Sequence, residues 1–348
     1  RPPRSTLFPY TTLFRSVGQQ LVALIHNHKG CEIEFLSSNS YADIPYSQIY
    51  GHHRHLEKKC IKTQDVEKYL PKVDLVFIAL PHGMAFNLVK KSLNNNVKVI
   101  DIGADFRLKD VDAYESWYKV SHEAADLISE AVYGLPEIYK DQIEKSSLIA
   151  NPGCYPTAGI LGLMPLLKHK LIDPSSIIID GKSGVSGAGK SVKVDNLFGE
   201  VNESLKAYSV ASHRHTPEIE QELSKIFNGE VKLTFTPHLI PMNRGILNTC
   251  YGTLVKKISK EELYELYKKE YQGDYFIRVI DDIPETKWVK GTNFCDIGLR
   301  VDERTNRVIL VSAIDNMMKG AAGQGVQNMN IMFGLEETTG LQIAPMIP

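Results

Sequence analysis

The stretch from Asp74 to Ile102 reads DLVFIALPHGMAFNLVKKSLNNNVKVIDI. The apolar runs 74–80 and 97–102 each have the length of a buried strand, and Pro81-His82-Gly83 breaks the first run. The segment between them, 84–93, has the spacing of an amphipathic helix. A strand, a helix and a second strand in this order are the unit of a parallel sheet, so the stretch predicts an α/β fold.

The rest of the chain shows a different pattern on each side of Pro174. Before it, from about residue 31 to 150, short apolar runs alternate with helix-like segments, which extends the parallel sheet. After it, longer strand-like runs predict a mostly antiparallel sheet: 177–180, 231–236, 249–255, 276–280, 295–301 and 308–314. Two helix starts are also indicated there, at Thr216-Pro217-Glu218 with Thr216 as N-cap, and at the capping box of 259–262. The 348 residues are enough for two domains.

Composition and charge exclude several classes of protein. The 40 Lys and Arg residues balance 41 Asp and Glu residues and are spread along the chain, so no nucleic acid partner is expected. The apolar run at 75–80 is far shorter than the roughly 20 residues that span a bilayer, so no membrane anchor is expected. The five cysteines lie far apart without a C-x-x-C, which argues against a disulfide framework or zinc site and favours a reducing cytoplasm.

The first sixteen residues, RPPRSTLFPYTTLFRS, have neither the apolar core of a signal peptide nor the alternation of a strand. TLFPYTTLFRS resembles the in-frame translation of a widely used sequencing adapter, so we interpret residues 1–16 as foreign sequence joined to a truncated gene; a natural disordered leader is the alternative. The native sequence is then expected to resume near Val17. It would lack a first strand and most of a glycine-rich nucleotide-binding turn, which predicts poor dinucleotide binding.

Cys154 is the candidate nucleophile, within the segment 151–157, NPGCYPT. Asn-Pro-Gly predicts a turn after the apolar residues 148–150, and Pro156 suits the first turn of a helix running through 159–167. The thiol is therefore expected at a helix N-terminus, where exposed N–H groups and the helix dipole stabilise a thiolate. The other four cysteines lack this setting and are interpreted as buried structural residues.

A nucleophilic cysteine needs a proton donor or acceptor, and two histidines are candidates. His213 and His215 precede the helix start at Thr216, where a turn can direct a side chain into a cleft. The sequence pattern alone does not distinguish between them. The three histidines within 52–55 lack further ligands at recognisable spacing, so no metal site is predicted.

The glycine-rich segment 181–191, GKSGVSGAGKS, follows a predicted strand. Residues 184–191 match the P-loop pattern G-x-x-x-x-G-K-S, which would indicate an ATP-dependent phosphotransferase. A P-loop opens directly into a helix, however, and the following residues 192–196, VKVDN, favour strand and turn. We therefore interpret the segment as a loop that covers a phosphate-bearing cofactor or substrate; a plain linker is the simpler alternative.

Together these segments resemble the N-acetyl-γ-glutamyl-phosphate reductase family, within the aspartate-semialdehyde-dehydrogenase-like group, from Val17 to the C-terminus. The segments that carry the resemblance are 101–107 (DIGADFR), 149–159 (IANPGCYPTAG), 183–189 (SGVSGAG), 213–218 (HRHTPE) and 316–324 (NMMKGAAGQ). The resemblance implies a Rossmann-type NADP-binding domain, residues 17–151 plus 316–348, to which the last helix returns. It also implies an inserted α+β domain, 152–315, for catalysis and oligomerisation as a homodimer or homotetramer.

The resemblance also implies the chemistry, in arginine biosynthesis. Cys154 would attack the small-molecule substrate N-acetyl-glutamyl phosphate at its γ-acyl phosphate, phosphate would leave, and NADPH would reduce the resulting thioester to the semialdehyde. His215 would relay the proton, with His213 as the competing assignment. Arg107 would bind the leaving phosphate, because a guanidinium matches phosphate oxygens.

The dinucleotide site is likewise implied by the resemblance. Ser38 and Ser40 would lie at the adenosine ribose and its 2′-phosphate, where hydroxyls suit NADPH better than a carboxylate would. The other implied contacts are Gly18, Pro81, Ser183, Gly184, Ser186, Gly187 and Asn316.

Three other functions fit parts of the sequence. A reductase of carrier-linked aminoadipyl phosphate, in lysine biosynthesis, would need a basic groove for an acidic carrier protein, which the scattered charge does not show. A P-loop phosphotransferase would use residues 184–191. A truncated product could also be a non-catalytic scaffold that still dimerises.

Overall fold

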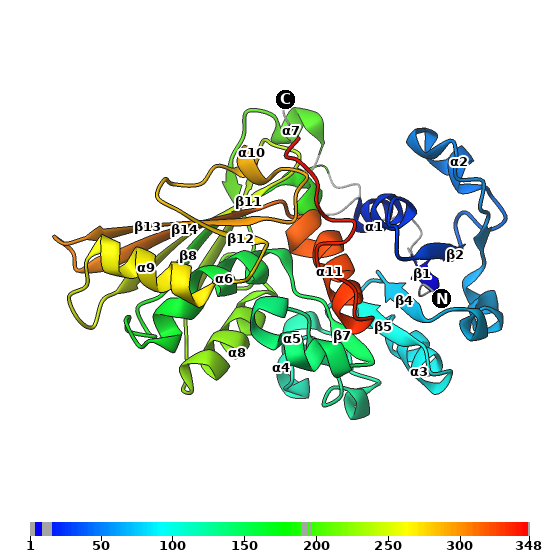
Figure 1. Cartoon of the computed structure of the whole chain (residues 1–348), viewed down its shortest axis with the longest axis horizontal. Coiled ribbons are helices and arrows are strands. Elements are labelled where there is room, and N and C mark those ends of the chain that lie inside the picture. The colour runs from blue at the N-terminus through cyan, green and yellow to red at the C-terminus, as the bar shows by residue number, and fades with distance from the viewer. Residues whose placement is uncertain (1–3, 9–15, 189–193, 195–196, 347–348) are drawn as a thin grey trace. The chain divides into compact units, whose positions relative to one another are not determined.

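The structure, a computed structural model, describes residues 4–8, 16–188, 194 and 197–346. The chain forms two compact units (Figure 1). The first unit comprises Arg1–Pro152 and Ala321–Gln342, and the second comprises Gly153–Gly320 and Ile343–Pro348. Among the helices of the described residues, none is long and apolar enough to cross a membrane.

A seven-stranded parallel sheet is the framework of the first unit, with strand order β3-β2-β1-β4-β5-β7-β6. Its strands are β1 (Arg4–Phe8), β2 (Glu32–Ser37), β3 (Cys60–Ile61), β4 (Leu75–Ile78), β5 (Lys98–Asp101), β6 (Val132–Tyr133) and β7 (Leu148–Ala150). The neighbouring strands all pair in parallel, which confirms the α/β prediction. All four residues of β4 are buried, as expected of a central strand with both faces covered.

The expectation that no strand precedes the first helix is wrong. Residues 4–8 form β1 in the middle of the sheet, where Ser5 lies opposite Ile33 of β2 and Leu75 of β4. An empty position there would leave the main-chain N–H and C=O groups of both neighbouring strands without partners, and a short extended segment can satisfy them whatever its side-chain pattern. Residues 9–15, where a glycine-rich turn would lie, fall outside the described residues.

Helices flank this parallel sheet. They are α1 (Ser16–His26), α2 (Tyr46–Ile49), α3 (Phe86–Asn94), α4 (Val111–Tyr118), α5 (Pro136–Lys145) and α11 (Gly323–Met332), with 3-10 turns at Gly51–His53, Thr63–Lys68, Leu70–Lys72 and Ala125–Leu127. Phe86 and Val89 of α3 are buried in the same core cluster as Val76 and Val99 of β4 and β5, so the predicted strand–helix–strand unit is present. Helix α11 packs against α1 and α5, which confirms that the last helix returns to the first domain.

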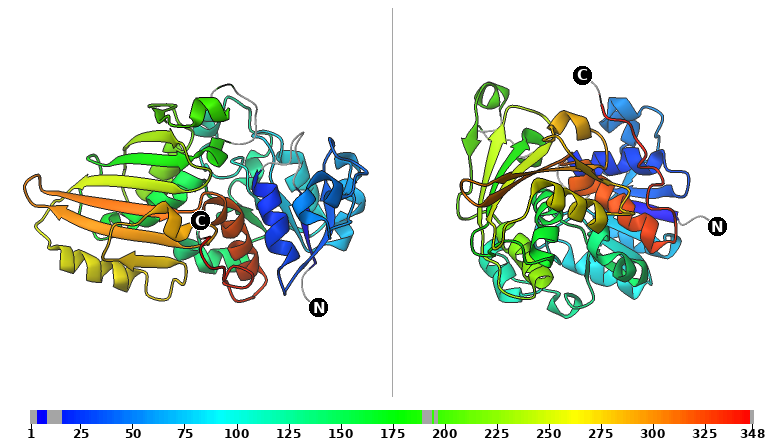
Figure 2. Two further views of the ribbon diagram at one scale, coloured as in Figure 1. Left: turned by 90° about the horizontal axis from the view of Figure 1, so that it is seen from above. Right: turned by 60° about the vertical axis from the view of Figure 1, so that its left-hand side comes forward.

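A second seven-stranded sheet forms the second unit, in the order β12-β13-β14-β11-β8-β10-β9 (Figure 2). Its strands are β8 (Ile178–Gly184), β9 (Lys206–Ala207), β10 (Thr234–Ile240), β11 (Ile246–Thr253), β12 (Ile277–Ile280), β13 (Cys295–Asp302) and β14 (Arg307–Ile314). The pairs β8–β10 and β12–β13 are parallel and the other neighbouring strands are antiparallel, as the longer strand-like runs predicted.

Helix α6 (Cys154–Lys168) is the central helix of the second unit, and its residues 155–167 are all buried. It packs on β11 and β14 and against two other helices, α8 (Thr216–Phe227) and α9 (Lys260–Glu270). The remaining helical elements are α7 (Phe198–Val201), α10 (Thr286–Val289), a 3-10 turn at Val185–Ala188 and a π-helical turn at Met318–Ala322.

The structure confirms one of the two predicted helix caps and corrects the other. The capping box is confirmed, because Ser259 accepts a hydrogen bond from the Glu262 N–H and the Glu262 carboxylate accepts one from the Ser259 N–H. The predicted N-cap of α8 is wrong by one residue. Thr216 is already helical and His215 occupies the cap position without a side-chain cap hydrogen bond.

Candidate active site

The thiol of Cys154 lies where the sequence predicted it, in the first residue of a helix. Strand β7 ends at Ala150, and α6 begins at Cys154 with Gly153 as an extended N-cap residue. Of the five cysteines, all of them in described segments, four are buried and Cys154 is partly exposed. The thiol is therefore the accessible one, at the end of the helix where the dipole favours a thiolate.

Glu218 fixes the main chain beside this thiol and was not predicted as a site residue. Its side chain is fully buried, and Oε1 accepts a hydrogen bond of 2.8 Å from the Gly153 N–H. Glu218 belongs to the first turn of α8, so one carboxylate joins the start of α8 to the start of α6. The sequence offered the signal of an acid in a first turn, which is ordinarily a helix-dipole residue.

Both candidate histidines lie beside Tyr155, the residue that follows Cys154. The ring centroids of His213 and His215 are 5.8 Å and 6.2 Å from that of Tyr155, and 4.7 Å from each other. The His215 main-chain N–H donates to Nδ1 of His213 over 3.1 Å. The structure thus brings the two imidazoles together at the start of α8, next to the start of α6.

The surroundings of His213 disfavour its protonated form. Burial, with a further contribution from the positive charge of Arg214, lowers the pKa of His213 to about 4. Since Nδ1 of His213 accepts a hydrogen bond, the neutral ring carries its proton on Nε2. His213 is therefore neutral near pH 7 and is held in one tautomer within an aromatic cluster that includes Tyr208 and Phe235.

Two tyrosines, Tyr155 buried and Tyr208 half-buried, line the same region. The Tyr208 hydroxyl lies 3.4 Å from that of Tyr155, which also donates to the His238 carbonyl. Burial raises the pKa of both phenols, to about 12 for Tyr208, so each stays protonated as a hydrogen-bond donor. No sequence motif marks Tyr208 as a site residue.

The glycine-rich segment 181–191 is only partly the predicted loop, because residues 181–184 are the last four of β8 and Val185–Ala188 form a 3-10 turn after it. Ser183 is buried, with its hydroxyl donating to the Gly184 carbonyl, and Gly187 lies so close to Ser183 that a Cβ would come within 2.6 Å of Oγ. At Gly184 a Cβ would be 2.8 Å from main-chain atoms of the segment 243–244. Glycine is required at that position because two stretches of backbone meet there.

Asn316 ties this loop to a second one. Its Nδ2 donates to the Ser186 hydroxyl over 3.0 Å, and its Oδ1 accepts from the Gly245 N–H over 2.8 Å. The structure therefore brings together the five residues of the second unit that the resemblance assigned to the dinucleotide. For the P-loop interpretation of 184–191, Lys190 and Ser191 lie outside the described residues.

The predicted cofactor residues of the first unit are placed around one edge of its sheet. Ser38 is buried directly after β2, Ser40 is exposed, and Pro81 lies three residues after β4. The carboxyl ends of parallel strands share one edge, which is where Rossmann-type sheets bind dinucleotides. Gly18 is buried in the first turn of α1, where a glycine allows close packing of the helix.

Arg107 is buried, and its guanidinium is engaged with main-chain carbonyls. Nε donates to Asn151 over 2.8 Å and Nη2 donates to Ile102 over 2.9 Å. These bonds hold the segment that leads into the Asn-Pro-Gly turn before Cys154. In this structure the observed role of Arg107 is to fix that segment, and its contact with a leaving phosphate stays a prediction.

Two family models match the chain. The semialdehyde dehydrogenase NAD binding domain matches residues 16–146, and the semialdehyde dehydrogenase dimerisation domain matches residues 154–316. The two matches cover most of the described sequence and divide it close to Cys154.

Curated relatives match over nearly the full chain. The N-acetyl-gamma-glutamyl-phosphate reductase of Clostridium novyi (strain NT) is 53% identical over 332 residues, covering 95% of this chain and 96% of that protein. The protein of the same name from Lachnospira eligens is 52% identical over 336 residues, again covering 95% and 96%.

Solved structures share the fold at low identity. Aspartate semialdehyde dehydrogenase II from Vibrio cholerae superposes with a TM-score of 0.74 at 16% identity, covering 96% of this chain and 99% of that one. An aspartate semialdehyde dehydrogenase with NADP from Candida albicans gives a TM-score of 0.71 at 15% identity, with the same coverage. These likenesses support the two-domain fold class that the sequence predicted.

Proposed function

This chain belongs to the N-acetyl-gamma-glutamyl-phosphate reductase family, and we propose that it reduces N-acetyl-L-glutamyl 5-phosphate to N-acetyl-L-glutamate 5-semialdehyde in arginine biosynthesis, with NADPH as reductant. Relatives with the family's name are about half identical to the chain over 95% of its length. The observation that carries the mechanism is the partly exposed Cys154 at the start of α6.

Cys154 provides covalent catalysis in this proposal. Its Sγ forms a bond to the acyl carbon while the bond from that carbon to the phosphate oxygen breaks, and phosphate leaves with the electron pair. NADPH supplies the hydride that reduces the resulting thioester. As the carbon–sulfur bond then breaks, the aldehyde is released and the helix N-terminus stabilises the returning thiolate.

We assign the proton transfers to His215 rather than to His213. A general acid and base needs a pKa near the working pH, and burial holds that of His213 at about 4. Nδ1 of His213 is also occupied by the His215 N–H. His213 therefore supports the turn, and His215 protonates the substrate oxygen during reduction and takes the proton back when the aldehyde forms.

The geometry of the glycine-rich segment supports the proposed cofactor site. In the second unit the close backbone approach at Gly184 and the Asn316–Ser186 hydrogen bond make a compact loop of the kind that can lie against a dinucleotide. We propose that this loop, with Ser183 and Gly187, holds the nicotinamide end. In the first unit we propose contacts from Gly18, Ser38, Ser40 and Pro81, with the serines at the 2′-phosphate.

We also propose a role for each unit, an oligomeric state and a location. We assign dinucleotide binding to residues 17–151 with 316–348 and catalysis to residues 152–315, with residues 1–16 as foreign sequence. The dimerisation-domain match supports a homo-oligomer, which we propose to be a homodimer or homotetramer. Five free cysteines suit a cytoplasmic location.

The test is the reverse reaction, reduction of NADP+ with N-acetylglutamate semialdehyde in the presence and absence of phosphate. We expect phosphate-dependent activity that Cys154→Ser abolishes. Lys190→Ala, which would remove the essential lysine of a P-loop, should leave most of that activity. A folded, NADPH-binding protein without activity on this aldehyde would favour the aminoadipyl substrate instead.

A further inference from the structure

Asp315 is a fully buried carboxylate directly after the end of β14. Oδ1 accepts hydrogen bonds from the main-chain N–H groups of Met317 and Met318, over 2.8 Å and 3.1 Å. Oδ2 accepts from the Gly291 N–H over 2.7 Å and lies 3.5 Å from Nε of Arg244. One side chain thus joins three segments of the second unit that are far apart in sequence.

The first of these segments is the turn at residues 316–320, which lies against Cys154. The main-chain carbonyl of Asp315 accepts from the N–H groups of Met318 and Gly320, so both its side chain and its backbone hold the turn. At Gly320 an added Cβ would lie 2.8 Å from Cβ of Cys154. The backbone of this turn therefore packs directly against Cys154, and Asp315 sets its position.

The second segment is the loop at 243–245, which carries Arg244. Asn316, the residue after Asp315, accepts from the Gly245 N–H, and the Gly245 carbonyl accepts from the Gly184 N–H over 2.9 Å. Gly245 has φ +123°, a backbone conformation that glycine permits. Asp315 holds this loop through the guanidinium of Arg244. The side chain of Asn316 holds the same loop at the Gly245 N–H and the proposed nicotinamide loop at the Ser186 hydroxyl.

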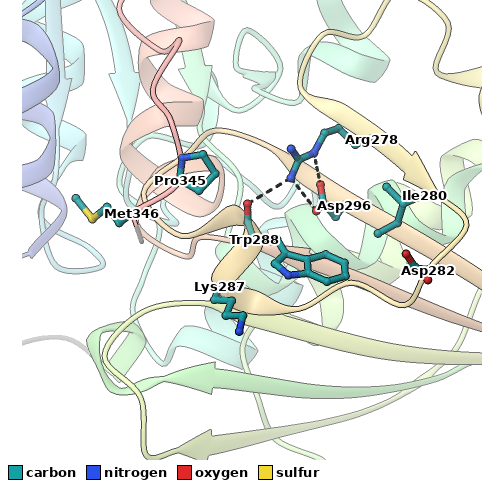
Figure 3. A pocket seen from close by; sticks show the side chains of 8 residues that line it. All are labelled: Arg278, Ile280, Asp282, Lys287, Trp288, Asp296, Pro345 and Met346. Atoms are coloured by element: carbon teal, nitrogen blue, oxygen red, sulfur yellow. Dashed lines mark hydrogen bonds and ion pairs between the residues drawn. The ribbon is translucent and has the colours of Figure 1, made fainter. Parts of the chain in front are cut away.

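The third segment carries Gly291, which has φ +78°. The Met346 N–H donates to the Lys290 carbonyl, and a Cβ on Gly291 would be 2.8 Å from Cγ of Met346. Met346 also lines a cavity of about 610 Å³ with Pro345, β12 and α10 (Figure 3). The chain segment 345–346 therefore packs closely against Gly291.

We propose that Asp315 is a positioning residue whose charge fixes the turn Asn316–Gly320. This turn holds the loops at 183–187 and 243–245 together and keeps the backbone at Gly320 against Cys154. This role rests on the proposed function, because that function makes Cys154 a nucleophile and the two loops a cofactor site. A carboxylate suits it, since every group that faces Asp315 in these contacts is a donor. An amide in its place would direct an NH2 group at one of those donors and leave it without an acceptor.

The test compares the unsubstituted chain with Asp315→Asn at a temperature well below unfolding. We measure the rate of Cys154 alkylation by iodoacetamide, with the modified peptide identified by mass spectrometry, and the Kd for NADPH. We expect alkylation at least threefold faster, because the backbone packed against Cys154 loosens, and a Kd for NADPH at least fivefold higher. Neither measurement needs turnover, so an inactive chain that shows both changes would contradict only the proposed function.

Two controls separate positioning from general loss of stability. Leu263→Ala empties a fully buried site on α9 and should lower Tm without changing either measurement. Asp302→Asn, in the exposed β13–β14 hairpin, should change nothing. If Asp315→Asn does not fold, Arg244→Gln removes the charge partner at a less buried site and should raise the Kd for NADPH at least threefold. Values within twofold of the unsubstituted chain, for a folded Asp315→Asn or for Arg244→Gln, overturn the proposal.

Discussion

Replacing His213 with asparagine should remove a pH-dependent loss of stability. His213 is neutral and enclosed by Tyr155, Tyr208 and Phe235 in the folded protein, whereas an unfolded chain exposes it to water. Asparagine does not titrate between pH 4 and 8, and its Oδ1 can accept from the His215 N–H as Nδ1 does now. His213→Asn therefore isolates the titration from the hydrogen bond.

The magnitude follows from the two pKa values. The pKa is about 4 in the folded state against a reference value of 6.5, so below pH 6.5 the unfolded chain binds a proton that the folded chain does not. Folding stability therefore falls as pH drops through this window and the loss levels off below pH 4. At about 1.4 kcal/mol per pH unit, the loss attributable to His213 between pH 7 and pH 5 is about 2 kcal/mol.

The assay is urea unfolding at pH 7 and pH 5, followed by tyrosine and tryptophan fluorescence. The free energy of unfolding of the unsubstituted second unit should fall by about 2 kcal/mol more than that of His213→Asn. Equal pH dependence in the two proteins would show that His213 titrates normally when folded. His213 would then be as suitable an acid and base as His215 is proposed to be.

Three further predictions test other parts of the molecule. Gly184→Ala places a methyl group 2.8 Å from the main chain of Asn243 and Arg244, so the KM for NADPH should rise severalfold, measured by initial rates. Ser259→Ala removes the capping box of α9 and should cost about 1 kcal/mol in urea unfolding, with kcat unchanged. Replacing residues 9–15, which contain no glycine, with a glycine-rich turn should lower the Kd for NADPH at least tenfold in a fluorescence titration. The reason is that glycines allow close approach to a pyrophosphate. Tight binding by the present chain would contradict this prediction.

Local pattern was enough to predict most elements and the position of the candidate nucleophile. The run at 74–102 has the periodicity of its own strands and helix, and Asn-Pro-Gly before Cys154 specifies a turn that ends in a helix N-terminus. These features depend on neighbours within a few residues. Local pattern did not predict the strand at residues 4–8, whose side-chain pattern is not that of a strand. The open position between β2 and β4 decides their conformation.

The sequence by itself determined the fold class, the family and the place of the candidate nucleophile Cys154 at a helix N-terminus. Only the tertiary structure decided which groups control that residue, because their contacts join distant segments. Glu218 reaches Gly153 across 65 residues, and Asp315 reaches Gly291 across 24. Burial, which lowers the pKa of His213, is likewise a property of the packed aromatic cluster and has no counterpart in the motif His-Arg-His.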